Sequence, residues 1–384
     1  MSWEVNDEIA LIITIGDSKV KRIAKVTTVN VDGSAVISMN IPAEVTTNSV
    51  ELYYPASEVE LSGSTYPFQS AGVIVKYTVK DLNNNSLDVS SLKLLFPPYN
   101  NINVTLTTPD DEVYVVMSTG ASNVLHWFEA TGSDGKKYVT KGTTPALYSG
   151  KYYRTTMKMA TVGDVILTNG TFAAPTSTDA KAAMIAYIGS DADGSDNSDP
   201  SKWHGLAIAL TDANSSNYCK WSDNTSENAG VSTSETKANH KAFLNGIKET
   251  QTLITKYGGS YAAAKAANYS VAGFTPVDYG YSGWFLPSSG QWMKFFEATG
   301  MNGVDSGDWG DYVSGGSANW TKVNTLMETA ATGSSVKDNG NYWASSEQTE
   351  GNAATVGFYS TYGVRINNVN KNSNYNYVRS FLAF

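Results

Sequence analysis

The sequence is poor in the residues that build covalent and metal-dependent sites. It contains one cysteine, Cys219, and three histidines among 384 residues. A single cysteine cannot form an intrachain disulfide, so a fold held together by disulfides is excluded. We expect Cys219, which lies in an aromatic stretch, to be a small buried core residue.

Long hydrophobic runs are also missing. The longest one near the start covers residues 9–13 and follows Glu4, Asp7 and Glu8. It is far shorter than the ~20 residues that cross a bilayer, and acidic residues do not precede the apolar core of a signal peptide. We therefore expect neither a transmembrane helix nor an export signal in this chain.

Positive charge is scarce and scattered. Lys and Arg number 27 against 36 Asp and Glu, which gives a formal net charge of −9. Phosphate binding needs clustered Lys and Arg, and no such cluster stands out, so nucleic acid is not expected as a partner. Charged residues make up 16% of the chain, so much of the polar surface must come from Asn, Ser, Thr, Gly and Tyr.

The groups able to do chemistry do not form a known catalytic pattern. His126 and His204 lie in apolar, strand-like stretches, and His240 lies in a helix-like one. None is spaced from a Ser or Cys nucleophile as in a known motif, and no glycine-rich phosphate loop or His/Cys metal motif is present. We predict no enzymatic activity and no cofactor. A hydrolase that acts on glycans through paired carboxylates stays open as an alternative.

One acidic run is a candidate calcium loop. Asp191, Asp193, Asp196 and Asp199 place carboxylates at close spacing. A calcium-binding EF-hand loop requires glycine at its sixth position, which Asp196 occupies here. We therefore predict a solvated acidic loop and no metal site.

Residues 1–158 have the pattern of consecutive short strands. Val73, Val75, Tyr77 and Val79 alternate with polar residues, which is the period of a half-buried strand. Asp134-Gly135 marks a turn. Further strands are expected over residues 35–41, 102–107, 113–117 and 148–159. Short strands with turn signals, and no convincing helical pattern, predict an all-β sandwich.

From residue 159 onward the pattern changes to mixed helices and strands. Phe243, Ile247 and Ile254 share one helical face that a glycine pair ends, and Ser288 with Gln291 matches a capping box. Further helices are expected over residues 261–268 and 320–331, and strands over 342–345, 354–359, 364–368 and 377–384. Residues 159–384 are therefore predicted to form an α+β domain, so the chain is expected to be multi-domain.

Three separated blocks of the second half resemble a known family. They are Gly283-Trp284-Phe285-Leu286-Pro287-Ser288, Asn341-Tyr342-Trp343-Ala344-Ser345-Ser346-Glu347 and the ending Tyr377-Val378-Arg379-Ser380-Phe381-Leu382-Ala383-Phe384. Together they resemble the C-type-lectin-like domains of surface proteins from gut Bacteroidales. The resemblance implies a C-type-lectin-like fold for residues 159–384. Trp284 and Trp343 are expected in its core, whereas Trp309 lies in a Gly/Asp loop and either packs or stacks on a sugar.

Many members of that group resemble variable proteins of diversity-generating retroelements. In those proteins, adenine-directed mutagenesis rewrites Asn-type codons in a C-terminal variable region, which would be about residues 341–384 here. Val356, Phe358, Val364 and Ile366 would be the fixed residues that face the core. The displayed, ligand-binding residues would be Thr349, Gly351, Asn352, Thr355, Tyr359, Ser360, Tyr362, Arg365, Asn367, Asn368, Asn370, Asn372, Ser373, Asn374 and Tyr375.

The composition of residues 359–375 suits a binding face. Tyrosine supplies rigid contact area at a low entropy cost, while Asn and Ser supply adaptable donors and acceptors. A solvated, Asn-rich hairpin without a ligand is the alternative explanation of the same composition. The hypothesis of a binding face rests mainly on the family resemblance.

The first half resembles, more weakly, the fimbrillin-type pilin domains of the same bacteria. Tyr53-Tyr54-Pro55-Ala56 and Leu147-Tyr148-Ser149-Gly150-Lys151-Tyr152-Tyr153 carry this resemblance. It implies an extracytoplasmic adhesin, on the cell surface or at a fimbrial tip, that binds a protein or glycan on another cell. Other pilin subunits are further expected partners. The alternative is a structural envelope or pilin subunit whose lectin-like domain packs against a neighbour.

Overall fold

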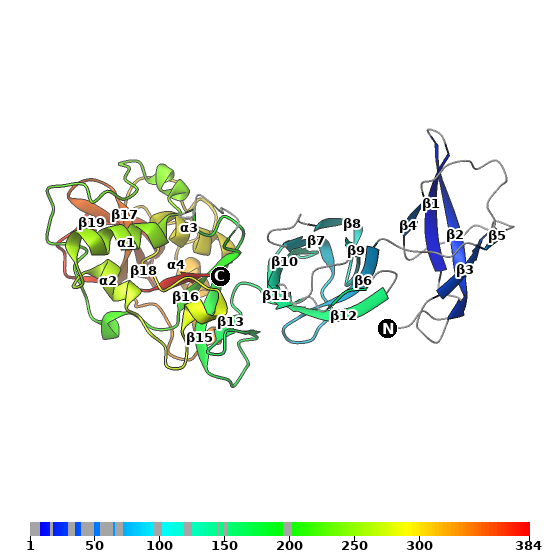
Figure 1. Ribbon diagram of the computed structural model, residues 1–384. Coiled ribbons are helices and arrows are strands. Elements are labelled where there is room, and N and C mark those ends of the chain that lie inside the picture. Colours follow the sequence, from blue (N-terminus) through cyan, green and yellow to red (C-terminus); the bar gives the residue numbers. More distant parts are fainter. Residues whose placement is uncertain are drawn as a thin grey trace. The chain divides into compact units, whose positions relative to one another are not determined.

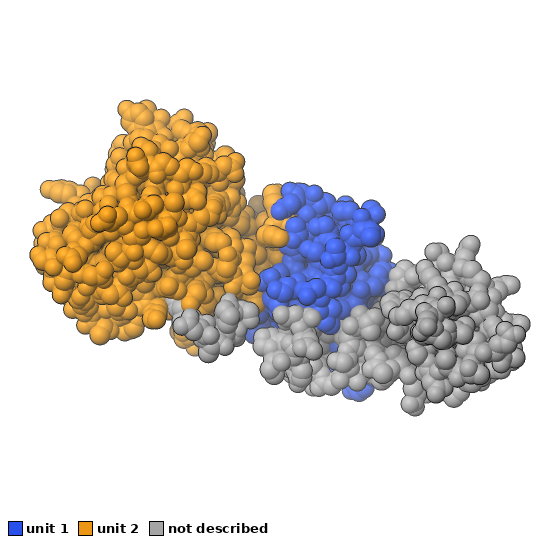
Figure 2. All heavy atoms as spheres, turned by 90° about the horizontal axis from the view of Figure 1, so that it is seen from above, with its two compact units in different colours: residues 1–135, 140–159 blue, residues 136–139, 160–384 orange. Residues whose placement is uncertain are grey.

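The computed structural model describes residues 8–15, 18–29, 35–39, 50–53, 64–65, 72–95, 102–118, 125–143, 146–148, 152–194 and 202–384. The chain divides into two compact units (Figure 2). Unit 1 comprises residues 1–135 and 140–159, and unit 2 comprises residues 136–139 and 160–384. The chain therefore passes for the last time from unit 1 to unit 2 beside residue 159, where the sequence pattern changes.

The first strands of unit 1 form an antiparallel sheet of their own (Figure 1). Its order is β4 (Val50–Tyr53), β1 (Glu8–Ile15), β2 (Ser18–Val29), β3 (Ala35–Met39) and β5 (Ser64–Thr65). The strand predicted over residues 35–41 is confirmed as β3. Tyr54, Pro55 and Ala56, which contribute to the fimbrillin resemblance, lie outside the described residues, as do residues 149–151 of its second motif.

The other strands of unit 1 form two sheets that face each other. One has the order β11 (Lys137–Thr143), β10 (Leu125–Gly132), β7 (Val89–Leu95) and β8 (Ile102–Asp110). The other has the order β12 (Tyr152–Met159), β6 (Gly72–Asp81) and β9 (Glu112–Ser118). The rings of Tyr77 on β6 and Phe128 on β10 lie 5.5 Å apart, so the two sheets pack as a sandwich.

The strand periodicity of this region is confirmed in detail. Val75, Tyr77 and Val79 are buried and alternate with partly exposed residues on β6, as half-buried strands require. The turn predicted at Asp134-Gly135 joins β10 to β11, and Gly135 adopts a positive φ of 78° there. The predicted single sandwich over residues 1–158 did not anticipate the separate sheet formed by β1 to β5.

The described residues of unit 2 form two sheets and four α-helices. The first sheet has the order β14 (Phe172–Ala173), β13 (Val165–Leu167), β15 (Lys181–Ile188), β16 (Gly205–Ala209) and β21 (Phe381–Ala383). The second has the order β19 (Gly363–Asn370), β18 (Asn352–Tyr359), β17 (Gly340–Glu347) and β20 (Asn376–Tyr377). The helices are α1 (Gly246–Tyr257), α2 (Ala262–Ala267), α3 (Ser289–Ala298) and α4 (Ser317–Ala330), with 3-10 turns η1 (Asn214–Ser216), η2 (Lys237–Ala242) and η3 (Pro276–Tyr279).

The second sheet is packed on both faces. Trp292 of α3 contacts Phe358 of β18 and Phe381 of β21, and this aromatic group forms the centre of the main core. On the opposite face, Leu253 of α1 belongs to a second buried cluster that includes Trp343 of β17. Most of this sheet is therefore rigid, which is what a surface for precise recognition needs.

Two sequence expectations need correction in unit 2. Phe243 precedes α1 and caps η2, so it does not share the helical face of Ile247 and Ile254. The strand predicted over residues 377–384 is two short strands in different sheets, because β20 pairs with β17 whereas β21 pairs with β16. The capping box is confirmed: Gln291 N donates to Ser288 Oγ, and Ser288 N donates to Gln291 Oε1.

Candidate functional site

The β18–β19 hairpin sorts its side chains between the core and the opposite face. Val356, Phe358, Val364 and Ile366 are fully buried in the main core, which confirms the four predicted core-facing positions. Because strand residues alternate in direction, the residues between them lie on the other face of the sheet. Gly357 pairs there with Arg365 in the strand register.

Three tyrosines and one arginine gather at the end of this face where the hairpin turns. We call Tyr312, Tyr359, Tyr362 and Arg365 the tyrosine surface. The ring of Tyr312 lies 5.6 Å from that of Tyr359 and 5.4 Å from that of Tyr362. The guanidinium carbon of Arg365 lies 4.6 Å from the Tyr359 ring centre and 5.6 Å from that of Tyr312. The cation therefore lies within cation–π range of both rings, which attract it and order it.

Hydrogen bonds fix the orientation of the group. Arg365 Nη2 donates to Tyr359 Oη at 2.5 Å, and Tyr359 Oη donates to Asn341 Oδ1 at 3.1 Å. Gly357 leaves room for them, since a Cβ there would lie 2.7 Å from Tyr359 Cε2 and 2.6 Å from Asn341 Oδ1. The surface thus combines ordered inner groups with the exposed ring of Tyr362, which is 58% accessible.

Tyr312 reaches this surface from a distant loop. Gly310 N donates to Ile366 O at 3.0 Å and Val313 N donates to Val364 O at 2.8 Å, so residues 310–313 lie along β19. These bonds form an isolated bridge between Tyr312 and Arg365. Sequence reasoning missed Tyr312. Its position among Gly and Asp residues was the available signal, but the pairing of this loop with β19 cannot be read from local pattern.

Several predicted residues lie at the opposite end of the hairpin. Asn352 pairs with Asn370, whereas Tyr359 pairs with Gly363 at the turn. At ~3.3 Å per residue the two ends are about 23 Å apart. Thr349, Gly351, Asn352, Asn368, Asn370 and Asn372 are partly or fully exposed at or near this far end or in the loops beside it, and the structure does not bring them to the tyrosine surface.

The remaining predicted residues occupy different surroundings. Ser360 is held at the turn, where its Oγ donates to Asp338 Oδ2 at 2.7 Å. Asn367 pairs with Thr355 on the face that carries Arg365, one step along β19. Thr355 is a correction, because it is completely buried and cannot be displayed.

A second, smaller aromatic group surrounds the start of β20. Tyr375 is 76% exposed, and its ring lies 6.2 Å from that of Tyr218, which in turn lies 4.6 Å from Tyr377. A hydrogen bond between Tyr218 and Tyr377 raises the pKa of Tyr377 to about 12. Ser373 and Asn374 precede this group in a partly exposed loop. Tyr218 was also missed by the sequence reasoning, because it lies outside the C-terminal segment.

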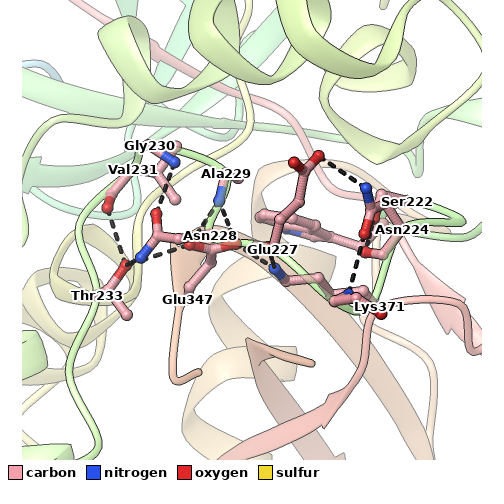
Figure 3. Close-up of polar contacts among 12 residues, drawn as sticks. Ser222, Asn224, Glu227, Asn228, Ala229, Gly230, Val231, Thr233, Glu347 and Lys371 are labelled. Carbon is pink, nitrogen blue, oxygen red and sulfur yellow. Dashed lines mark hydrogen bonds and ion pairs between the residues drawn. The ribbon is translucent and has the colours of Figure 1, made fainter. Parts of the chain in front are cut away.

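One residue of the Asn-rich segment is not displayed at all. Lys371 is fully buried and forms an ion pair with the equally buried Glu347 (Figure 3). Its ammonium also donates to Glu227 O at 3.1 Å and lies 5.0 Å from the Trp221 ring centre. Glu347 further accepts hydrogen bonds from Ala229 N at 2.9 Å and Thr233 Oγ1 at 3.2 Å. This buried pair ties the chain after β19 to residues 221–233.

Three residues of types that serve in catalysis, His240, Ser289 and Glu249, lie in the interior of unit 2. His240 Nδ1 lies 2.8 Å from Ser289 Oγ, but both residues are fully buried, and burial lowers the pKa of His240 to about 4. Burial also raises the pKa of Glu249, whose carboxylate accepts from Ser232 N at 3.1 Å and from Ser345 Oγ. These groups make hydrogen bonds in the interior of unit 2.

Acidic side chains and helix lengths bear on metal binding and on membrane insertion. In the part of the chain that the structure describes, no three His, Cys, Asp or Glu side chains lie close enough to hold a metal ion. Asp196 and Asp199 of the candidate calcium loop lie outside the described residues, and the Asp191 carboxylate forms an ion pair with Lys294. No helix among the described residues is long and apolar enough to cross a membrane.

Three residues that were predicted to be buried are so in the structure. Trp284, Trp343 and Cys219 are buried, as predicted. Trp343 Nε1 donates to the carbonyl of Cys219 at 2.8 Å, so these two residues help to hold the loop that covers the sheet. Trp309 is only partly buried and lines a pocket of its own.

Comparisons with known proteins give distant similarities. No family model and no curated protein matches the chain. A fimbrial protein from Bacteroides ovatus ATCC 8483 is 14% identical over 100% of this chain and 95% of its own, with a TM-score of 0.42. A DUF4876 family protein from Bacteroides thetaiotaomicron VPI-5482 is 14% identical over 42% of this chain and 38% of its own, with a TM-score of 0.17.

A putative cell adhesion protein from Bacteroides ovatus ATCC 8483 is 12% identical over 47% of this chain and 87% of its own, with a TM-score of 0.14. All of these TM-scores are low.

Proposed function

We propose that this chain is an extracytoplasmic adhesin, on the cell surface or on a fimbria, that binds a protein or glycan of another cell through the tyrosine surface. The observation that carries this proposal is the cation–π contact of Arg365 with both Tyr312 and Tyr359 on a packed sheet, beside the exposed ring of Tyr362. Aromatic and arginine side chains with fixed orientation are the residues that dominate binding energies at interfaces.

Binding of the purified chain to a glycan array and to fixed mammalian and bacterial cells tests this proposal. The double variant Tyr312→Ser with Tyr362→Ser should lower binding about tenfold or more, since each ring is expected to act as an anchor. Tyr148→Ser is the matched control, because Tyr148 is 65% exposed and belongs to unit 1. Equal binding by the wild type, the double variant and the control would refute the role of the surface.

The finer part of the proposal is that residues 341–384 form a diversified region of a C-type-lectin-like domain. The exposed Asn and Tyr side chains of this region support it, whereas the buried Lys371 and Thr355 set limits on which positions tolerate change. The encoding DNA tests it. A neighbouring reverse-transcriptase gene and a near-repeat of these codons, differing where the repeat carries adenines, are expected. Absence of a repeat would remove the diversification hypothesis and leave an invariant adhesin.

A second candidate function is that of an assembly subunit, and a groove in unit 1 favours it. The groove has a volume of about 540 Å³ and is lined by β11 and β12 together with Val75, Tyr77 and Phe128. β11 and β12 are the outer strands of their sheets among the described strands, and Val139 of β11 already exchanges backbone hydrogen bonds with Ala160. The remaining length of these two outer strands would pair with a strand of another chain. An occupant strand would join one subunit to the next.

Light scattering across a range of protein concentrations tests assembly. Thr155→Trp fills the groove, because Thr155 is exposed and lines it, and this variant should stay monomeric where the wild type forms oligomers. Thr321→Trp places the same side chain on the exposed surface of unit 2 and should behave as the wild type does. A wild type that stays monomeric at every concentration contradicts this candidate function.

A further inference from the structure

A pocket that is separate from the tyrosine surface lies between two segments of unit 2. It has a volume of about 420 Å³ and is lined by residues 235–238 and 305–309. This volume lies within the range of roughly 300–1,000 Å³ that small-molecule sites occupy. We call it the Trp309 pocket. Apart from Trp309, its lining carries a lysine and three carboxylates.

Reciprocal hydrogen bonds hold the two segments together. Lys237 Nζ donates to Ser306 O at 2.8 Å and to Asp308 O at 3.4 Å. In return, Trp309 Nε1 donates to Glu235 O at 2.6 Å. Each segment thus gives one side chain to the backbone of the other, so the pocket exists before any ligand arrives. A preformed site avoids the cost of ordering its walls upon binding.

The charges of the lining discriminate between classes of ligand. Lys237 is only 3% exposed, and a lysine ammonium has three donors, of which two are used here. Asp305 is already paired with Lys241, whose Nζ lies 3.6 Å from Asp305 Oδ2. An anion would meet the carboxylates of Glu235 and Asp308, and a cation would meet the ammonium of Lys237. A neutral ligand that carries many hydroxyl groups satisfies both, since hydroxyls donate to carboxylates and accept from an ammonium.

The aromatic wall adds the remaining requirement. Trp309 is partly exposed in the pocket, and the edge contact with His240 at 4.7 Å between ring centres holds its ring in place. An aromatic ring offers a flat apolar face next to these polar groups. A pyranose has hydroxyl groups around its rim and an apolar C–H face, so it matches the whole lining. We propose that the Trp309 pocket binds a neutral pyranose residue.

Saturation-transfer NMR with the full chain tests this proposal. The neutral probes are methyl α-D-glucopyranoside, methyl β-D-galactopyranoside and N-acetyl-D-glucosamine, and the charged probes are D-glucosamine and D-glucuronate. We expect saturation transfer to at least one neutral probe that exceeds the transfer to both charged ones. Transfer to no neutral probe, or stronger transfer to a charged one, overturns the proposal.

Variants locate the signal. Ala238→Phe should abolish it, because Ala238 is exposed and lines the pocket, so the added ring fills the space without removing a contact that holds the fold. Asp308→Asn should weaken binding by about threefold to tenfold through the loss of one charged acceptor. Val277→Phe, at a position 62% exposed outside the lining, is the matched control and should bind as the wild type does.

An unchanged signal in a folded Ala238→Phe variant overturns the assignment to this pocket. The double variant of Tyr312 and Tyr362 separates this proposal from the adhesin proposal, because neither residue lines the pocket. Loss of cell binding with retained sugar binding leaves the pocket proposal intact. Loss of sugar binding in that double variant would assign the sugar to the tyrosine surface and overturn the pocket.

Discussion

At the scale of single residues, the stability of unit 2 depends on the buried ion pair between Lys371 and Glu347. Both side chains are completely buried, so each charge depends on the other and on its hydrogen bonds. Removal of one partner leaves the other charge buried and unpaired. Lys371→Met should therefore lower the free energy of unfolding by about 3–5 kcal/mol, as measured by urea denaturation.

Two further variants separate this charge effect from loss of packing. Lys220→Met removes a surface ion pair with Asp223 and should cause a much smaller loss, since water screens exposed pairs. Combining Lys371→Met with Glu347→Leu removes both charges and should recover part of the stability. If Lys371→Met and Lys220→Met lower the free energy of unfolding equally, the buried pair does not make the expected contribution to stability.

His240 predicts a dependence of stability on pH. Its pKa is lowered to about 4 by burial, whereas the unfolded value is near 6.5. The unfolded chain therefore binds a proton that the folded chain does not as the pH falls from about 6.5 to about 4, and stability falls with it. This single group accounts for at most about 3 kcal/mol between those limits.

His240→Gln removes this contribution while keeping a polar group. Urea midpoints at pH 7, 5.5 and 4.5 should show a smaller loss on acidification for the variant than for the wild type. Carboxylates that titrate in the same range affect both proteins and cancel in the difference. Parallel losses in the two proteins would contradict the lowered pKa of His240.

Residue-level prediction from sequence succeeded where hydropathy decides and failed where tertiary partners decide. Val356, Phe358, Val364 and Ile366 were predictable because apolar residues at strand period must face a core. Thr355 and Lys371 are polar, so the sequence placed Thr355 on the surface and left Lys371 inside an Asn-rich display segment. Their burial depends on distant groups such as Glu347, which local pattern does not reveal.

At the scale of elements, the helix ends that depend on neighbouring residues in the sequence were predictable. The capping box at Ser288 and the stop of α1 at Gly258 depend on neighbours in sequence, and both are present. The pairing of residues 310–313 with β19 and the division of the C-terminal run between two sheets depend on long-range contacts. Tyr312, one of the two tyrosines that contact Arg365, was missed for this reason.

The β18–β19 turn makes an element-scale prediction. Gly363 has a φ of +95°, and a Cβ there would lie 2.1 Å from Gly316 O. Gly363→Ala therefore adds a backbone clash to the strain of a positive φ, and should lower the free energy of unfolding by about 2–4 kcal/mol. Gly333→Ala is the control, since Gly333 has a φ of +80° but no atom within 4 Å of the added Cβ.

Gly333→Ala should cost only the strain of the positive φ, about 1 kcal/mol. Because Gly363 ends the hairpin beside Tyr362, Gly363→Ala should also weaken ligand binding at the tyrosine surface. Urea denaturation and the cell-binding assay measure the two effects. Equal losses of stability for the two alanine variants would show that Gly316 moves aside and that the turn is not fixed by this contact.

At the scale of the whole molecule, the two compact units predict two unfolding events. Unit 2 has its own core and includes residues 136–139, where Val139 and Ala160 exchange backbone hydrogen bonds of 2.8 and 2.9 Å. Thr161 Oγ1 adds a bond to Lys137 O at 3.0 Å. A fragment of residues 136–384 contains all of unit 2 together with residues 140–159 of unit 1. This fragment should fold alone and reproduce one transition of the full chain in calorimetry.

A fragment of residues 160–384 tests how much residues 136–139 contribute to the stability of unit 2, and it also omits residues 140–159 of unit 1. It lacks these three hydrogen bonds, so its Tm should be lower than that of the 136–384 fragment by about 5–10 °C. An identical Tm would show that residues 136–139 lie against unit 2 but do not contribute to its stability. A single transition of the full chain, together with an unfolded 136–384 fragment, would show that the two units depend on each other for folding, and the tyrosine surface would then need the whole chain.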